Sequence, residues 1–469
     1  MTPTSSEPEA IFHLQQGARW RLAATGHRDR ARRLRRLQAA LLARRGEAQA
    51  ALALDFGKPA EEVDLTELYP VLAEIRHALR HLRSWMKPRR VGNPLTYFGT
   101  ASSIRPEPKG VVLVISPWNY PLFLALGPLV SALAAGNCVI LKPSEFTPHA
   151  NAFLKSLLGD CFPQEEVAVL EGAAETAQAL LALPFDHIFF TGSPAVGKRV
   201  MAAAAEHLCP VTLELGGKSP VLVDAGADPA DAARKIAWGK FLNAGQTCVA
   251  PDYVLVHADL HDRLVAELAR AVRSFYGPGP EQWQASPDFA RIISRRHLDR
   301  LTGLLAASGG EIVLGGQSDP AINYLAPTLV TGVAADSPLM AEEIFGPILP
   351  ILKVGDLEAA IRFVNARPKP LALYVFSDRP ARAEAVLAAT TAGGSCVNDT
   401  VLHFAHPNLP GGGVGPSGFG KAHGVHGFQA FSNSRGVVRQ RTRFSLARML
   451  YPPFTARIRR LLGLMLRFF

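Results

Sequence analysis

The sequence predicts an α/β fold with doubly wound parallel sheets, and two patterns support this prediction. Short apolar runs rich in valine, such as GVVLVIS at 110–116 and CVILKP at 138–143, are typical of strands buried on both faces. Between residues 110 and 399 such runs alternate with stretches of helical periodicity, which is the order of βαβ units. The chain has 469 residues, which is enough for about three structural units.

The other elements follow from local patterns along the chain. Residues 10–88 are predicted to be helical because leucines and alanines recur at helical spacing. The arginine run within 31–52 forms either a solvated helix face or a patch for a membrane or nucleic acid. Turn-forming residues at 87–94 precede a hairpin expected at about 95–107. Strands are expected within 110–116, 138–143, 165–172, 186–193, 211–217, 220–225, 252–258 and 372–377, and helices within 121–136, 176–184, 194–207, 231–242 and 261–276.

The cysteines and the N-terminus exclude several classes of protein. The cysteines are widely spaced, odd in number and without a CxxC pair, so we expect no disulfide framework, no metal site and a reducing compartment. The N-terminus shows no apolar signal segment, and Pro, Gly and Asn residues interrupt the apolar span 111–141, so we expect no transmembrane helix there. The expected location is therefore the cytoplasm. The cysteines are Cys138, Cys161, Cys209, Cys248 and Cys396.

The basic character of the chain is concentrated near its C-terminus. From Thr400 to Phe469 there is no Asp or Glu, whereas Lys421 and nine arginines account for the net charge of +10. This distribution argues against nucleic-acid binding, which usually places basic residues around the site. Residues 455–469 are expected to form a basic amphipathic helix that contacts a membrane surface or, alternatively, docks on the body or on a partner subunit. Its apolar stripe consists of Ile458, Leu461, Leu462, Met465 and Phe469.

Two motifs could bind a dinucleotide. TGSPAVGK places Gly192, Ser193 and Gly197 in a turn between a strand and a helix, and the first amides of such a helix suit a pyrophosphate. LKPSE places Lys142 and Glu145 beyond the end of another strand, where doubly wound sheets bind their ligands. Each motif also has a structural alternative: a common strand–turn–helix junction, and a pair of solvated charges.

Two further motifs could supply catalytic groups. In SPWNYP, Asn119 follows Trp118 at the end of a strand, where its amide could hold an oxyanion. In TLELGGKSP, Glu214 lies within an apolar strand, where burial would raise its pKa and let it act as a general base near neutral pH. The alternatives are a turn asparagine and a glutamate that is paired with Lys218.

A cysteine and a glutamate–phenylalanine pair complete the set. In NAGQTCVAPDY, Cys248 is either a buried apolar residue or a nucleophile. In EEIFGP, Glu343 could bind sugar hydroxyls and Phe345 could cover a ring; alternatively, they form a turn with one packed aromatic. A cysteine combined with an oxyanion donor, a general base and a dinucleotide site defines a reaction class, so the combination favours an enzyme.

These motifs occur in the order found in aldehyde dehydrogenases, and over residues 10–450 the chain resembles that family. The class 3 branch, with its fatty and aromatic aldehyde dehydrogenases and bacterial coniferyl-type enzymes, is indicated by GQTCVAPDY, EEIFGPILP and PLALYVFS. The resemblance implies a Rossmann-like doubly wound cofactor domain, a second α/β catalytic domain and a small β oligomerisation arm in a homodimer. The resemblance rests on SPWNYP, LKPSE, FFTGSPAVGK, TLELGGKSP, FLNAGQTCVAPDY, PLMAEEIFGPILP and LPGGGVGPSGFG.

The resemblance also implies a role for each motif in oxidising an aldehyde to a carboxylic acid. Cys248 is the nucleophile that forms a thiohemiacetal and then a thioester, Asn119 holds the oxyanion, and Glu214 activates the water that releases the acid. NAD, with NADP as an alternative, accepts the hydride. The cofactor-binding residues are Trp118, Lys142, Glu145, Gly192, Ser193, Gly197, Glu343 and Phe345.

The resemblance gives expected boundaries and leaves several questions open. The late LPFGG motif of the family has Gly411 in place of its Phe, so the width of the substrate tunnel and the preference for long-chain aliphatic or aromatic aldehydes stay open. A cysteine esterase that uses the same residues without cofactor, and a non-catalytic membrane-associated scaffold, are the alternative functions. Expected domains are the NAD-binding domain at 1–88 and 109–216, the catalytic domain at 217–400, the arm at 89–108 and 425–443, and the tail at 444–469.

Overall fold

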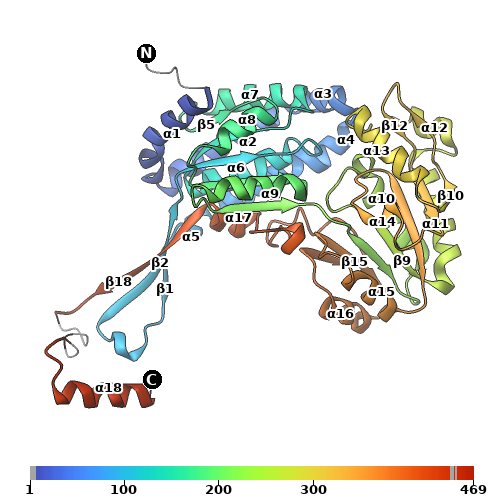
Figure 1. Cartoon of the computed structure of the whole chain (residues 1–469). Helices are drawn as coiled ribbons and strands as arrows, with labels where there is room; N and C mark the ends of the chain where they lie inside the picture. Colours follow the sequence, from blue (N-terminus) through green and yellow to red (C-terminus); the bar gives the residue numbers. More distant parts are fainter. Residues whose placement is uncertain (1–6, 444–447, 449–450, 469) are drawn as a thin grey trace.

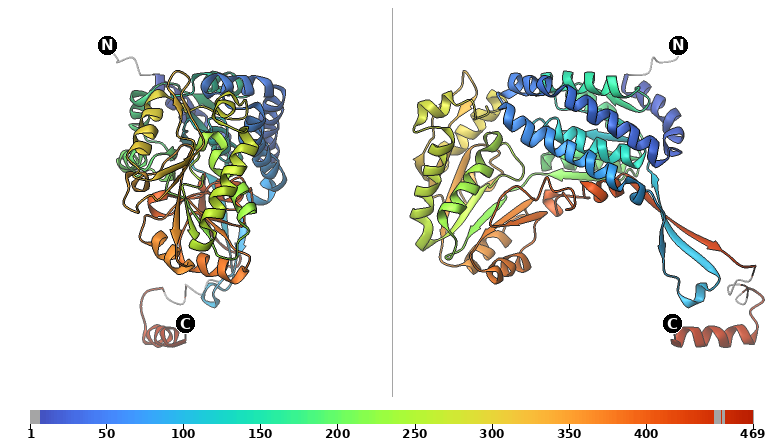
Figure 2. Two further views of the ribbon diagram at one scale, coloured as in Figure 1. Left: turned by 90° about the vertical axis from the view of Figure 1, so that its right-hand side faces the viewer. Right: turned by 180° about the vertical axis from the view of Figure 1, so that it is seen from behind.

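The computed structural model describes residues 7–443, 448 and 451–468, and it contains two α/β units, a projecting arm and a C-terminal helix (Figure 1). The two units lie next to each other, and the arm extends from the first unit (Figure 2). The predicted α/β fold class is confirmed.

The first unit is built on a six-stranded sheet with β3 (Val111–Ile115) near its centre. From β3 the chain runs outward through β4 and β5, and it then adds β6 and β7 on the other side of β3. The sheet is therefore doubly wound, as predicted, and ligands of such sheets bind where the strand order reverses. The strand order is β17-β7-β6-β3-β4-β5, with β4 (Cys138–Lys142), β5 (Val167–Val169), β6 (His187–Gly192), β7 (Val211–Leu215) and the antiparallel β17 (Gly418–Phe419).

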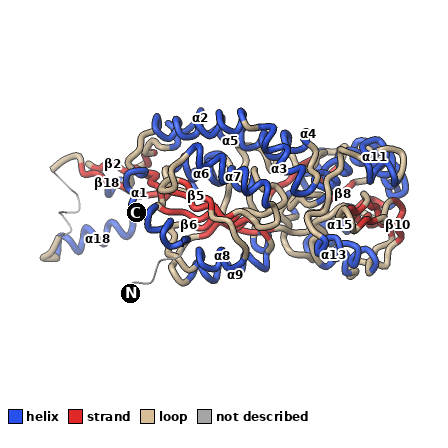
Figure 3. The backbone as a smooth tube through the Cα atoms, turned by 90° about the horizontal axis from the view of Figure 1, so that it is seen from above, coloured by secondary structure: helices blue, strands red, loops and turns tan. Residues whose placement is uncertain are grey.

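Helices cover both faces of this sheet (Figure 3). Val112 and Val114 pack into the core that contains α6 and α7, whereas Val111 and Leu113 pack into a second core with α1, α8 and α9. Because side chains alternate along a strand, burial on both faces requires the continuous apolar run seen in the sequence. The helices are α1 (Glu7–Ala23), α2 (His27–Ala43), α3 (Arg45–Phe56), α4 (Ala60–Val63), α5 (Tyr69–Trp85), α6 (Phe123–Ala135), α7 (Pro148–Cys161), α8 (Ala174–Leu181) and α9 (Pro194–Ala205).

Most arginines of α2 are exposed, as expected for a solvated helix face, whereas Arg30 and Arg33 contact other elements. Arg30 is buried and donates hydrogen bonds to the carbonyls of Ala134 and Ala135 at the end of α6. Arg33 pairs with Glu166 at 2.9 Å. Arg30 is buried and Arg33 is largely covered because the last carbonyls of a helix and a buried carboxylate need partners.

The second unit contains a seven-stranded sheet in the order β10-β13-β14-β9-β8-β15-β16. Its strands are parallel except for β10 at one edge. The strands are β8 (Pro220–Val223), β9 (Tyr253–His257), β10 (Glu311–Leu314), β13 (Thr328–Thr331), β14 (Ile348–Val354), β15 (Ala372–Phe376) and β16 (Gly394–Val397), and the helices are α10 (Pro229–Phe241), α11 (His261–Tyr276), α12 (Pro280–Ala285), α13 (Arg295–Ala306), α14 (Pro338–Ala341), α15 (Leu357–Asn365) and α16 (Pro380–Ala389).

The arm is a three-stranded antiparallel sheet in the order β1-β2-β18. Its hairpin pairs β1 (Arg89–Val91) with β2 (Thr100–Pro108), so the expected hairpin at 95–107 begins too late and contains the turn instead of the first strand. The third strand is β18 (Ser432–Gln440). The segment Gly424–Ala430, part of which was expected in the arm, is helix α17 and packs Phe428 on Trp85 of α5.

Helix α18 (Ala456–Phe468) confirms the helical periodicity of the tail; Phe469 lies outside the described residues. The helix lies beyond the arm and away from both sheets (Figure 1). Ile458, Leu461 and Met465 are partly covered, whereas Leu464 and Leu466 are exposed. Among the described residues, none of the helices combines the length and the apolar character needed to cross a membrane.

Candidate active site

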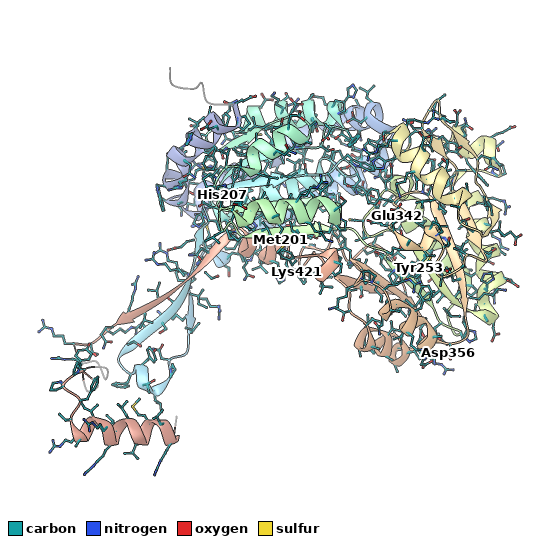
Figure 4. The ribbon with its side chains drawn as sticks, viewed as in Figure 1. Met201, His207, Tyr253, Glu342, Asp356 and Lys421 are labelled. Atoms are coloured by element: carbon teal, nitrogen blue, oxygen red, sulfur yellow. The ribbon has the colours of Figure 1, made fainter. Side chains whose placement is uncertain are left out.

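A cavity of about 810 Å³ lies at the ends of the strands, where the first unit meets the second. Met201 and Glu342, labelled in Figure 4, line it from α9 and from the segment before β14. Most of the predicted site residues line this one cavity, although they come from distant parts of the chain. They are Trp118, Asn119, Gly192, Ser193, Glu214, Cys248, Glu343 and Phe345.

Three predicted cofactor residues lie outside the lining of this cavity. Lys142 ends β4 and is buried, and its Nζ atom lies 3.3 Å from the carboxylate of Glu145, which is partly exposed. Gly197 is buried in α9, where a Cβ atom would lie 2.7 Å from Leu215 of β7. Gly197 therefore lets α9 approach the sheet closely, so that the N-terminus of the helix stands at the strand ends.

The loop that carries Cys248 is fixed to the loop that carries Asn119. The side-chain amide of Asn119 donates a hydrogen bond to the carbonyl of Gln246 at 3.0 Å, and Asn243 donates one to the carbonyl of Asn119 at 2.8 Å. Asn243 and Ala244 adopt left-handed backbone conformations, with φ of 54° and 52°. Such conformations are costly for non-glycine residues and cluster at functional sites.

Cys248 differs from the other cysteines in its surroundings. Cys138, Cys161 and Cys209 are buried, whereas Cys248 and Cys396 are partly exposed. Burial, followed by the nearby carboxylates of Glu343 and Glu214, raises the pKa of the Cys248 thiol. Cys396 lies outside the cavity lining and contacts Nδ1 of His403 at 3.2 Å. Cys248 is thus the partly exposed thiol that lines the cavity.

Glu214 is a buried carboxylate in β7 without hydrogen-bond partners among the described residues. Burial raises the pKa of Glu214 to about 7, and the charges of His423 and Lys421 oppose this rise. Lys218 instead pairs with Asp252, so the alternative of a glutamate paired with Lys218 is wrong. A buried polar group without partners calls for a functional explanation.

Glu343 and Phe345 also line the cavity. The carboxylate of Glu343 packs so closely on Gly216 that a Cβ atom there would lie 2.0 Å from Oε2. Burial, with a contribution from Asp252, raises the pKa of Glu343 to about 8. Phe345 has a φ of 50° and an edge-to-face contact with Trp118 at 5.4 Å. Both side chains belong to the wall of the cavity, so the alternative of a simple packed turn does not describe them.

A buried polar cluster behind the site was missed in the sequence. Lys58 and Glu67 form an ion pair at 2.8 Å with no side-chain exposure, and Lys58 lies 3.9 Å from the ring centroid of Tyr120. The hydroxyl of Tyr120 lies 2.6 Å from Oγ1 of Thr247, next to Cys248. Only the position of Tyr120 beside Asn119 could have pointed to this cluster, because Lys58 lies in no recognisable motif.

Gly411, which the sequence analysis associated with the substrate tunnel, adjoins His423. It is absent from the cavity lining and forms a β-bridge with Ala422. A Cβ atom at Gly411 would lie 2.3 Å from Cδ2 of His423. Its φ lies outside the left-handed range, so the backbone does not require glycine there. The missing side chain therefore leaves room for the His423 ring.

Comparison with known proteins identifies the family. The family model described as "Aldehyde dehydrogenase family" matches residues 6–437 of the chain. The chain is 45% identical over 430 residues to 4,4'-diaponeurosporen-aldehyde dehydrogenase of Staphylococcus aureus, covering 92% of this chain and 93% of that protein. It is 48% identical over 434 residues to aldehyde dehydrogenase family 3 member B1 of Rattus norvegicus, covering 92% of each. A probable coniferyl aldehyde dehydrogenase of Pseudomonas aeruginosa is 44% identical over 456 residues, covering 97% of this chain and 95% of that protein.

Solved structures agree with this assignment. A substrate-bound Staphylococcus aureus AldH superposes with a TM-score of 0.94 at 42% identity, covering 98% of this chain and all of that chain. A structure of PnpE in complex with nicotinamide adenine dinucleotide superposes with a TM-score of 0.84 at 26% identity, covering 92% and 89%. The chain belongs to the aldehyde dehydrogenase family, and it is an oxidoreductase that oxidises aldehydes. The predicted resemblance to class 3 enzymes is confirmed.

Proposed function

We propose that the protein oxidises a large apolar or aromatic aldehyde to its carboxylic acid, with NAD as the preferred cofactor, through a thioester on Cys248. The observation that carries this proposal is the pair formed in one cavity by a partly exposed thiol, Cys248, and a buried carboxylate, Glu214, which has no hydrogen-bond partner in the described part of the chain. A nucleophile and a general base in a shared site are what acyl transfer through an enzyme-bound thioester requires.

The proposed roles follow from the position of each group. The sulfur of Cys248 bonds to the aldehyde carbon, and the amide of Asn119, held beside the Cys248 loop, donates to the developing oxyanion. After loss of the hydride, the same sulfur holds the acyl group as a thioester. Glu214 then takes a proton from water, the water oxygen bonds to the acyl carbon, and the carbon–sulfur bond breaks to release the acid.

The cavity suits a dinucleotide cofactor. Residues Ser193, Pro194 and Ala195 at the N-terminus of α9 line the cavity, and a helix N-terminus favours an anionic group such as a pyrophosphate. One oxygen of Glu343 is buried without a partner among the described residues. Trp118 and Phe345 supply aromatic surfaces in the same wall. When bound, NAD supplies a hydride acceptor and a positive charge that favours the thiolate form of the cysteine. Lys142 and Glu145 are proposed to hold the adenosine ribose, where Glu145 disfavours a 2′-phosphate by like charge and Lys142 partly offsets this.

The substrate class is proposed from the apolar residues of the cavity and from the names of the relatives. Leu124, Met340 and Phe419 are among the lining residues. One relative is named for 4,4'-diaponeurosporen-aldehyde and another for coniferyl aldehyde, and these names support the proposed substrate class.

We also propose that the arm joins two copies of the chain. The outer strands β1 and β18 expose backbone edges, which are ready to pair with another chain. Helix α18 is proposed to contact a membrane surface, because its exposed leucines and its arginines occur together.

The experiment follows NADH at 340 nm with a panel of long aliphatic and aromatic aldehydes, with NAD or NADP. Cys248→Ala is expected to abolish turnover while NAD still binds, because the thioester cannot form. Cys396→Ala, at the other partly exposed cysteine, is the matched control and should keep turnover. Near-normal turnover in Cys248→Ala would refute the mechanism. Ester hydrolysis without any aldehyde oxidation would favour the alternative, a cysteine esterase.

A further inference from the structure

The space left by Gly411 is filled by a buried histidine that the proposed mechanism does not use. A Cβ atom at Gly411 would lie 2.3 Å from Cδ2 and 2.8 Å from Nε2 of His423. The imidazole stacks on Phe123 at 5.8 Å and meets Phe404 edge to face at 5.4 Å. The ring is therefore enclosed on several sides, and its position depends on a glycine at 411.

Glu74 of α5 holds this histidine from the side opposite Gly411. One carboxylate oxygen lies 2.9 Å from Nδ1 of His423, and the other accepts the backbone N–H of Gly424 at 3.1 Å. Both side chains are at least nine-tenths buried. His423 also has a φ of 67°, which is strained for a non-glycine residue. Strain of this kind persists only where the surroundings fix the residue, and it is common at functional sites.

The segment that contains Gly411 also lies close to Glu214. A Cβ atom at Gly412 would lie 2.8 Å from Oε1 of Glu214 and 3.3 Å from Lys421. Lys421 is occupied by the carbonyls of Gly412 and Gly413, at 2.8 and 3.2 Å. Gly411 thus adjoins His423, and the next residue, Gly412, adjoins Glu214, so both side chains contact one short segment. The charges of His423 and Lys421 oppose the rise in the pKa of Glu214, and the charge of Glu214 contributes to the raised pKa of the Cys248 thiol. The groups that act on His423 are Glu74 and Glu214.

We propose that His423, held by Glu74 in the space left by Gly411, is a positioning residue that keeps a positive charge beside Glu214. Burial lowers the pKa of His423, but its hydrogen bond to Glu74 and the charge of Glu74 outweigh this effect, so the pKa is raised. A charged imidazolium favours the carboxylate form of Glu214, which is the form that can take a proton from water. The inference rests on the proposed role of Glu214 as the base.

The first test is the pH dependence of acyl-enzyme hydrolysis, measured by rapid quench after the first turnover with NAD and an aldehyde. His423→Gln removes the charge, so the acid limb of the pH profile for acyl-enzyme hydrolysis should move to higher pH by about one unit in this variant. The first-turnover yield of NADH should not change. The matched control is His426→Gln, at a half-buried histidine of helix α17, which begins directly after His423; this variant should leave the profile unchanged.

Gly411→Ala tests the same idea without removing the histidine. Its methyl group must displace the His423 ring, so we expect a smaller shift in the same direction. Gly159→Ala, in an open position of α7, is the matched control. Thermal unfolding monitors the folding of every variant. If His423→Gln does not fold, the shift of the acid limb in Gly411→Ala tests the inference by itself.

The outcomes separate the inference from the proposed function. If both variants keep the wild-type acid limb while Glu214→Gln abolishes hydrolysis of the acyl-enzyme, His423 is only structural and the inference is wrong. If Glu214→Gln also hydrolyses its acyl-enzyme normally, it is the proposed role of Glu214 that has failed.

Discussion

Among single residues, Glu214 shows what a local pattern can and cannot predict. Its position in an apolar strand before two glycines indicated burial and a raised pKa, and the structure gives a buried side chain with a pKa of about 7. The pattern could not decide whether Lys218 neutralises it, because Asp252, which pairs with Lys218, is distant in the sequence. His423 and Glu74 were missed for the same reason, since 349 residues separate them.

The raised pKa of Glu214 predicts the pH dependence of the second half-reaction. Only the carboxylate can accept a proton from water, so hydrolysis of the acyl-enzyme should increase as the pH rises through about 7. An exposed glutamate would place this increase near the ordinary glutamate pKa of 4.5. The measurement is the hydrolysis rate from pH 5 to 9, after the first turnover. A rate that is constant from pH 5 to 8 would contradict this assignment.

Among elements, the strands and helices with strong periodicity were predictable, whereas their pairing partners often were not. The apolar runs of β3 and β4 are strands, as expected. The short strand β1 was not predicted because it lies among turn-forming residues before 95, and it is defined by its pairing with β2. The helices α2 and α17 contact distant elements through Arg30 and Phe428. Such contacts produce no periodic pattern in the sequence, so they could not be predicted from it.

The Lys58–Glu67 pair is expected to stabilise the elements around the Asn119 loop. Glu67 accepts the backbone N–H groups of Leu122 and Phe123 at the start of α6, so it fixes the loop that carries Asn119. Lys58→Met leaves a buried carboxylate without its cation, which should destabilise the fold by ~3–5 kcal/mol. The measurement is the midpoint of urea unfolding, followed together with turnover.

An exposed ion pair provides the control for this prediction. Lys155 and Glu171 lie 3.1 Å apart with both side chains exposed, so Lys155→Met should change stability by less than ~1 kcal/mol. Similar losses of stability in the two variants would mean that burial does not increase the contribution of the Lys58–Glu67 pair to the free energy of unfolding.

Helix α18 gives a prediction about membrane contact. Its exposed Leu464 and Leu466, together with its arginines, should bind the full-length chain to liposomes of anionic lipid. A chain that ends at Phe454 should not bind, and added salt should weaken binding of the full chain. The measurement is flotation at low salt. Equal flotation of the two chains, or none for either, would rule out this role for the helix.

At the scale of the whole molecule, the site exists only because the two units meet. Asn119 and Glu214 belong to the first unit, and Cys248 and Glu343 belong to the second. The sequence places SPWNYP, LKPSE and TGSPAVGK at strand ends, which predicts that these three motifs gather at one edge. The cavity between the units depends on how the sheets pack, and so does the closeness of Gly412 to Glu214. No local sequence pattern indicates these contacts between distant parts of the chain.

The most direct test of the account separates formation of the thioester from its hydrolysis in Glu214→Gln. Cys248 and Asn119 remain, so mixing the variant with NAD and aldehyde should release one equivalent of NADH per site in the first turnover. Loss of the general base should then lower steady turnover by ~10²-fold or more. A variant that shows no burst of NADH and keeps the normal steady rate would contradict the assignment of Cys248 and Glu214.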